Sequence, residues 1–170
     1  MGTLHGVVAS SLHLIEKTYG YDMGRLVMPE HLRQNKIAVS GVYKRVADIL
    51  CVLVEEYMKA GVDAVYYAAL GGEYRYYTDE EFAEYIEPLD KQVMTAIREN
   101  GGYCFLHICK DRLNMKRYAG YNEYADVVNW GVYEAPFSIE EGKKLFPGTT
   151  IMGGLANRSG VLVEGTEEEI

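Results

Sequence analysis

The feature that most limits the fold of this chain is a regular alternation of short apolar runs with helical repeats, which begins near residue 41. Apolar residues at helical spacing between Val42 and Tyr57 predict a helix, and Ala60-Gly61 ends it with a residue that tolerates a left-handed conformation. Short apolar, β-branched or aromatic runs predict strands at residues 63–70, 103–109, 125–130 and 149–155. Strands that alternate with helices pair in parallel through right-handed crossovers, so the sequence predicts an α/β fold.

Three capping boxes mark expected helix starts in the same region. They are Thr78–Glu81, Ser138–Glu141 and Thr166–Glu169, in which a hydroxyl and a carboxylate satisfy the free amides of a first helical turn. The apolar stripe after the first box runs from Phe82 to Ile97, and Pro88 inside it is expected to kink or restart the helix. A further helical region is expected at residues 113–124. A strand within residues 4–10 would bring the sheet to about five strands.

The number of strands bears on the architecture. A doubly wound sheet closes comfortably at about five strands, whereas a complete eight-stranded barrel typically needs about 250 residues. The third capping box opens a helix only one turn before the sequence stops at Ile170. This ending favours part of a TIM-type barrel, with about five parallel strands and covering helices. Residues 1–170 contain no linker or low-complexity stretch, so we expect a single domain.

Composition and charge limit the kinds of partner. The formal charge of -8 argues against a surface for nucleic acid or an anionic membrane, which would repel it. The basic residues between Lys110 and Arg117 are interleaved with other types and are interpreted as a solvated helix face. No window reaches the roughly 18 apolar residues of a membrane helix. The odd number of cysteines, three, indicates reduced thiols and a cytoplasmic protein.

His107 and Cys109 stand two residues apart at the carboxyl end of a predicted strand, where parallel α/β folds build their sites. Residues separated by two project to the same face of a strand, so an imidazole and a thiolate can reach one ion. Zinc accepts such ligands, and a catalytic zinc takes three from the protein. The ordinary alternative is a core histidine beside a small apolar thiol. A third ligand does not follow from the spacing of the remaining candidates, which are Cys51, Cys104, His5, His13 and His31.

Several other residues at strand ends are candidates for the wall of a ligand pocket. Asn129 and Trp130 end a strand with an amide and the only indole of the chain. The adjacent Tyr66 and Tyr67 place one ring toward the interior and one toward the helices, with core packing as the ordinary role. Gly153 follows the last strand and would let a ligand approach the backbone, although glycines there also serve simply as turns.

Taken together, these segments resemble the uroporphyrinogen decarboxylase family over roughly residues 40–170. The segments that carry the resemblance are Ala60–Tyr67, Phe82–Pro88, Leu106–Cys109, Val128–Trp130, Gly142–Gly148 and Met152–Leu155. The resemblance implies a TIM barrel with its pocket at the carboxyl ends of the strands. It also implies one of two activities: tetrapyrrole decarboxylases, which need no cofactor, or zinc-dependent methyltransferases, which move methyl groups between corrinoid proteins and thiols.

The resemblance gives the candidate residues specific roles. His107 and Cys109 resemble the first two zinc ligands of the methyltransferase branch, and Tyr67, Asn129, Trp130 and Gly153 would bind substrate. Lys110 stands where these sequences usually have glycine. The third zinc ligand of the family pattern would lie beyond Ile170. No stretch matches the acidic residue and arginines on which the decarboxylases rely near the beginning of the barrel.

Our first hypothesis is therefore a family enzyme that acts on a tetrapyrrole or a corrinoid-linked substrate, with the His-x-Cys pair suggesting zinc-dependent methyl transfer to a thiol. The alternatives are a cofactor-free uroporphyrinogen decarboxylase and a truncated, non-catalytic barrel that serves as a binding or assembly module. The expected partners are a small molecule or a corrinoid protein. Exposed sheet edges would also allow a homo-oligomer.

Overall fold

The computed structural model describes residues 1–156 and 159–169, and within them five parallel strands form one sheet. The strands are β1 (Gly2–His5), β2 (Ala64–Ala69), β3 (Tyr103–Ile108), β4 (Val127–Trp130) and β5 (Thr150–Ile151). The α-helices are α1 (Val7–Tyr19), α2 (Tyr21–Gln34), α3 (Lys36–Lys59), α4 (Asp79–Tyr85), α5 (Glu87–Glu99), α6 (Ile139–Leu145) and α7 (Val161–Glu164). Two short 3₁₀ helices are η1 (Met115–Tyr118) and η2 (Tyr121–Glu123).

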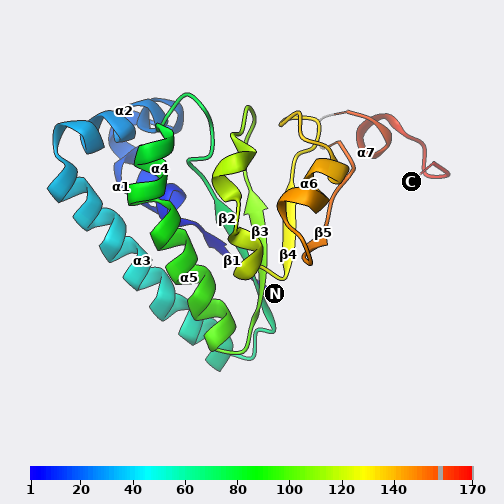
Figure 1. Ribbon diagram of the computed structural model, residues 1–170, viewed down its shortest axis with the longest axis horizontal. Helices are drawn as coiled ribbons and strands as arrows, with labels where there is room; N and C mark the ends of the chain where they lie inside the picture. The colour runs from blue at the N-terminus through cyan, green and yellow to red at the C-terminus, as the bar shows by residue number, and fades with distance from the viewer. Residues whose placement is uncertain (157–158, 170) are drawn as a thin grey trace.

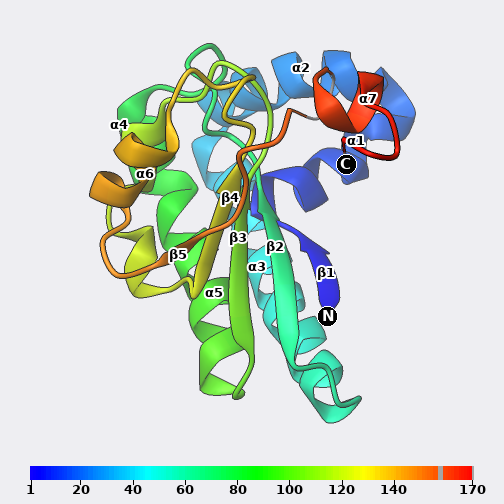
Figure 2. The same ribbon diagram turned by 90° about the vertical axis from the view of Figure 1, so that its right-hand side faces the viewer.

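The two faces of the sheet differ in how they are covered. Helices α3 and α5 run side by side along one face (Figure 1), and the strand residues that point toward this face, such as Tyr67, Leu106 and Val128, are fully buried. The alternate residues, such as Tyr66 and Phe105, are only half-buried. Figure 2 looks onto this second face. We call it the uncovered face.

The strand order distinguishes between the two architectures that the sequence left open. The strands are neighbours in the order β1-β2-β3-β4-β5, which is also their order along the chain. A doubly wound sheet reverses its strand order and carries helices on both faces, whereas a TIM-type barrel keeps sequential order with helices outside. The sheet is not closed. The expected fold class, a partial TIM-type barrel, is confirmed.

Several helices begin where local sequence signals predict a start. Thr78 and Glu81 exchange the two hydrogen bonds of a capping box at the start of α4, and Ser138 and Glu141 do the same for α6. The expected restart at Pro88 is also observed, because α4 ends at Tyr85 and α5 begins with proline in its first turn.

Other boundaries differ from the prediction. The helical region expected at 113–124 consists of the two 3₁₀ turns, which are separated by Gly120 at a φ of 82°. The expected N-terminal strand ends at His5, and residues 7–34 form α1 and α2. The last strand is limited to β5. Residues 167–169 form a turn in which Glu169 accepts from the Thr166 amide, and the helix expected beyond it falls on residue 170, outside the described residues.

Arg117 corrects the interpretation of residues 110–117 as a solvated helix face. Its side chain is only 5% exposed, and its Nε donates to Asp79 Oδ1 at 2.8 Å. The other guanidinium nitrogens donate to the backbone carbonyls of Gly71, Glu73 and Tyr77. Arg117 therefore holds the loop between β2 and α4 in place, which the charge pattern alone could not reveal.

The described helices include none with both the length and the apolar character that crossing a membrane requires.

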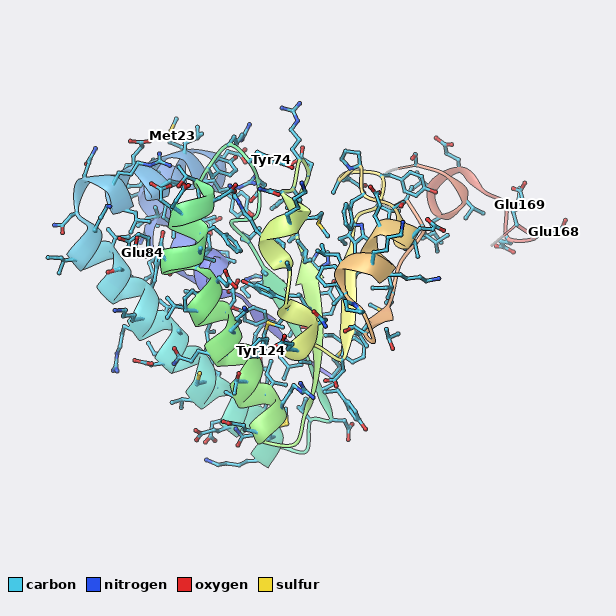
Figure 3. The ribbon with its side chains drawn as sticks, in the orientation of Figure 1. Met23, Tyr74, Glu84, Tyr124, Glu168 and Glu169 are labelled. Atoms are coloured by element: carbon cyan, nitrogen blue, oxygen red, sulfur yellow. The ribbon has the colours of Figure 1, made fainter. Side chains whose placement is uncertain are left out.

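Met23 of α2 and Tyr74 of the loop after β2 lie at the end of the molecule where the strands finish (Figure 3).

Candidate functional site

The structure brings His107 and Cys109 to one cavity at the carboxyl ends of the strands. His107 lies on the uncovered face near the end of β3, and Cys109 follows the strand with its amide bonded to the carbonyl of Ala69 at 3.1 Å. Both line a cavity of about 340 Å³. The other lining residues are Tyr21, Asp22, Arg25, Lys110, Asp111, Gly131 and Glu134. The strand parity that the sequence suggested is therefore the observed one.

Asn129 determines which nitrogen of the His107 ring carries the proton. The amide nitrogen of Asn129 donates to the carbonyl of Met152 at 2.7 Å, which leaves its Oδ1 as an acceptor 2.6 Å from His107 Nδ1. His107 Nδ1 must therefore carry the proton in this contact. Burial lowers the pKa of His107, although the hydrogen bonds with Asn129 oppose this, so the ring is neutral near pH 7. Its Nε2 lone pair is then available to a cation or a proton.

Tyr66 belongs to the same cluster. Its ring stacks on His107 with 5.4 Å between centroids, and its hydroxyl donates to Asn129 Oδ1 at 3.3 Å. Burial raises the pKa of Tyr66, so the hydroxyl keeps the proton that it donates. The sequence singled out Tyr67 instead. Only the register of β2 against β3 shows that Tyr66 shares a face with His107.

Tyr67 and Trp130 are not brought to this cluster. The Tyr67 hydroxyl donates to Asp90 Oδ1 at 2.5 Å on the helix-covered face, where Tyr67 is fully buried. Trp130 is 2% exposed, and its Nε1 donates to the carbonyl of Phe137 at 2.9 Å. Both residues have the opposite strand parity to His107. The structure thus places them in the core rather than in the wall of the His107 cavity, which corrects their expected position.

Gly153 does lie beside the cluster. A Cβ atom built on Gly153 would come within 3.5 Å of the Asn129 amide nitrogen. Of the four residues expected to bind substrate, Asn129 and Gly153 therefore lie near His107. Gly153 directly follows Met152, and the carbonyl of Met152 accepts the hydrogen bond from Asn129.

The backbone after Cys109 has an unusual conformation. Lys110 has a φ of 89° and Arg112 a φ of 50°, a region that residues with a side chain enter at a cost of about 1 to 3 kcal/mol. A glycine would adopt this conformation without strain. The turn brings the Lys110 ammonium 4.8 Å from the centre of the Tyr21 ring.

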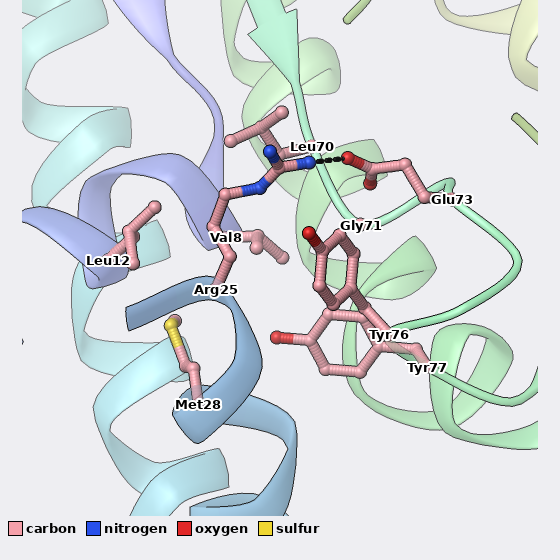
Figure 4. A pocket seen from close by; sticks show the side chains of 9 residues that line it. All are labelled: Val8, Leu12, Arg25, Met28, Leu70, Gly71, Glu73, Tyr76 and Tyr77. Carbon is pink, nitrogen blue, oxygen red and sulfur yellow. Dashed lines mark hydrogen bonds and ion pairs between the residues drawn. The ribbon is translucent and has the colours of Figure 1, made fainter. Parts of the chain in front are cut away.

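Arg25 of α2 lines both this cavity and a smaller, mostly apolar pocket. It forms an ion pair with Glu73 in the loop after β2 (Figure 4), and its guanidinium lies 4.8 Å from the centre of the Tyr76 ring. Both members of the pair are largely buried, at 14% and 4% exposure. The pair therefore fixes the position of a cation at the rim of the His107 cavity.

His107 and Cys109 suit a zinc ion as a pair of ligands. A neutral imidazole with a free Nε2 and a thiol are the nitrogen and sulfur donors that zinc accepts. The bond from Nδ1 to Asn129 Oδ1 fixes the tautomer and the orientation of the ring, as an outer hydrogen bond does for a metal-binding histidine. Within residues 1–156 and 159–169, no group of three or more His, Cys, Asp or Glu side chains is placed to hold a metal. Among the described residues, His107 and Cys109 are thus two candidate donors and do not complete the three-ligand set of a catalytic zinc.

Sequential parallel strands, helices on one face and polar groups at the strand ends define a TIM-type barrel protein with its site at the rim of the sheet. The family model for uroporphyrinogen decarboxylase (URO-D) matches residues 18–170, and the chain belongs to this family. Comparison with curated proteins and with solved structures gave no match.

Proposed function

We propose that the chain acts in a uroporphyrinogen decarboxylase family enzyme whose substrate is a tetrapyrrole or is linked to a corrinoid, and that His107 and Cys109 bind zinc for methyl transfer to a thiol. The observation that carries this proposal is the neutral His107 ring, locked by Asn129, which opens on the same cavity as the Cys109 thiol. Family membership supports the substrate class, and the ligand pair supports the reaction.

Zinc bound at this pair would hold the substrate thiol as a thiolate, which is the nucleophile that methyl transfer needs. The residues of the chain have separate tasks. Asn129 keeps the proton of His107 on Nδ1, and Tyr66 stacks on the ring and holds the same amide oxygen. Burial raises the pKa of Cys109, so the side chain is a thiol until a cation binds and releases its proton.

The proposal extends to partners and location. The cavity at the strand ends would receive a small molecule or the cofactor of a corrinoid protein. β1 and β5 are the edges of the described sheet, and an unpaired edge is a template for pairing, so we include a homo-oligomer formed through these edges. The three cysteines are free thiols, which supports a cytoplasmic location.

Metal analysis of the purified chain tests the ligand pair. We expect Cys109→Ser and His107→Ala each to hold about one zinc per chain fewer than the wild type. Cys51→Ser is the matched control, because Cys51 is a half-buried thiol on α3 outside the cavity, and it should keep the zinc. Asn129→Leu should weaken zinc binding about 10-fold to 100-fold, because it removes the hydrogen bond that orients His107. Equal zinc content in the wild type and Cys109→Ser would contradict the proposal, and so would a wild-type chain without zinc, which would favour a cofactor-free decarboxylase.

A further inference from the structure

A pair of histidines, His5 and His13, lies at the other side of the uncovered face, in a part of the chain that precedes the family match. We propose that His5 and His13, supported by Glu16, form a binding site for a divalent transition-metal ion such as zinc. This inference does not depend on the proposed function, because it uses none of the residues of the His107 cavity.

The two rings already face each other at nearly the spacing that an ion requires. His5 ends β1 and His13 lies in α1, and the chain reverses between them at Gly6. His5 Nδ1 and His13 Nε2 are 3.0 Å apart. Zinc–nitrogen bonds of 2.0–2.1 Å at a tetrahedral angle place two ligand nitrogens about 3.3 Å apart. The contact is a hydrogen bond in which His5 Nδ1 donates to His13 Nε2, so an ion would replace this proton. The rings would then move apart by a few tenths of an ångström and tilt until both lone pairs point at the ion.

Glu16 gives His13 the arrangement that metal-binding histidines usually have. Glu16 Oε2 lies 2.6 Å from His13 Nδ1, so the carboxylate accepts the Nδ1 proton and the Nε2 lone pair points toward His5. A carboxylate on the remote nitrogen of a ligand histidine fixes its tautomer and raises its basicity. His13 is thus held in the tautomer that a metal ligand needs, whereas His5 must release its Nδ1 proton when the ion binds.

Backbone and side-chain contacts hold the two elements in this relation. The Gly6 amide donates to the carbonyl of Ala68 at 2.8 Å, and the Ser10 hydroxyl donates to the carbonyl of His5 at 2.8 Å. These bonds fix the turn between β1 and α1, so the approach of the rings follows from the fold and not only from two mobile side chains.

The surroundings indicate the kind of ion and where its other ligands would come from. Two imidazoles suit zinc, copper and nickel rather than calcium or magnesium. The side chains of His13 and Glu16 are 44% and 39% exposed, so water or an external ligand can complete the coordination. His5, Ala68 and His107 share one register row across β1, β2 and β3, so the ion would stand at the same end of the uncovered face as His107.

Zinc titration of the Cys109→Ser variant tests this inference separately from the first site. Calorimetry should show one zinc bound per chain by Cys109→Ser, and none at that site in the double variant Cys109→Ser, His13→Asn. Glu16→Gln in the same background should weaken binding about 10-fold to 100-fold while the far-ultraviolet spectrum stays unchanged, because Glu16 is on the surface and does not touch the ion. His31→Asn, a histidine on α2 outside the pair, is the matched control and should leave binding unchanged.

Two results would overturn the inference. One is a Cys109→Ser chain that binds no zinc, and the other is equal zinc binding in Cys109→Ser with and without His13→Asn. The proposed function fails on a different result, namely retention of the first zinc when Cys109 is replaced, so the failure of one leaves the other standing.

Discussion

Asp90 makes the stability of this chain depend on pH in a direction opposite to that of most carboxylates. Asp90 lies on α5 and is 1% exposed, where it accepts from the Tyr67 hydroxyl at 2.5 Å and from the Tyr121 hydroxyl at 3.4 Å. Burial raises the pKa of Asp90 to about 7, and the hydrogen bonds from the two tyrosines oppose this only in part. In the unfolded chain the carboxyl has an ordinary pKa of about 3.9.

The sign and size of the effect follow from these two values. Between about pH 4 and pH 7 the folded chain binds more protons at Asp90 than the unfolded chain does, so the free energy of unfolding falls as the pH rises. The difference of about three pKa units corresponds to about 4 kcal/mol, all of it lost above pH 7. Asn in place of Asp90 removes the charge and keeps an acceptor for Tyr67. We therefore expect the free energy of unfolding of Asp90→Asn to exceed that of the wild type by about 2 to 4 kcal/mol at pH 8, so that the variant unfolds at a higher urea concentration. Near pH 4 the two proteins should be equally stable.

Urea denaturation followed by circular dichroism at several pH values measures this difference. Asp48→Asn is the matched control, because Asp48 lies exposed on α3 and bonds to Gln92 of α5 at 3.1 Å. It should change the free energy of unfolding by less than about 0.5 kcal/mol at every pH. A gain from Asp90→Asn that is the same at pH 4 and pH 8, or no gain at either, would refute the reasoning from burial.

Two further predictions concern packing and the loop after β2. A Cβ on Gly142 of α6 would lie 2.1 Å from the buried Trp130 ring, so Gly142→Ala should lower the free energy of unfolding by about 1 to 3 kcal/mol, whereas Gly41→Ala in α3, where a Cβ meets open space, should raise it by up to about 1 kcal/mol. Arg117→Met should cost about 3 kcal/mol, because it leaves three backbone carbonyls of the loop without their donor, while Met at the exposed neighbour Lys116 should change stability by less than about 0.5 kcal/mol. Urea denaturation measures all four variants, and equal effects for the members of either pair would contradict the argument.

Much of the fold could be predicted because its signals are local. The capping boxes at Thr78 and Ser138 and the proline at position 88 act within one helical turn, and the structure has the expected helix starts there. The spacing of His107 and Cys109 also carried reliable information, because strand parity depends only on adjacent residues.

The remaining features depend on contacts between distant segments. Tyr66 and Tyr67 are equivalent in sequence, and the covered face of the sheet is decided by α3 and α5, so the sequence alone did not show which tyrosine meets His107. Arginine is usually a surface residue, so the type of residue 117 gives no sign of burial. Arg117 is buried because its guanidinium donates to backbone carbonyls about 40 residues earlier in the chain. The pairing of His5 with His13 likewise required the turn between β1 and α1.

The hydrogen bond from Asn129 to the Met152 carbonyl couples the segment after β5 to the affinity of His107 for a ligand. A ligand on His107 Nε2 binds more tightly when Asn129 Oδ1 keeps the proton on Nδ1. The position of Asn129 depends in turn on the hydrogen bond from its amide nitrogen to the carbonyl of Met152, which follows the two-residue strand β5. Because the two equilibria are coupled, a ligand bound to the imidazole must favour the docked position of the segment after β5. Undocking of that segment must lower the affinity for the ligand by the same factor.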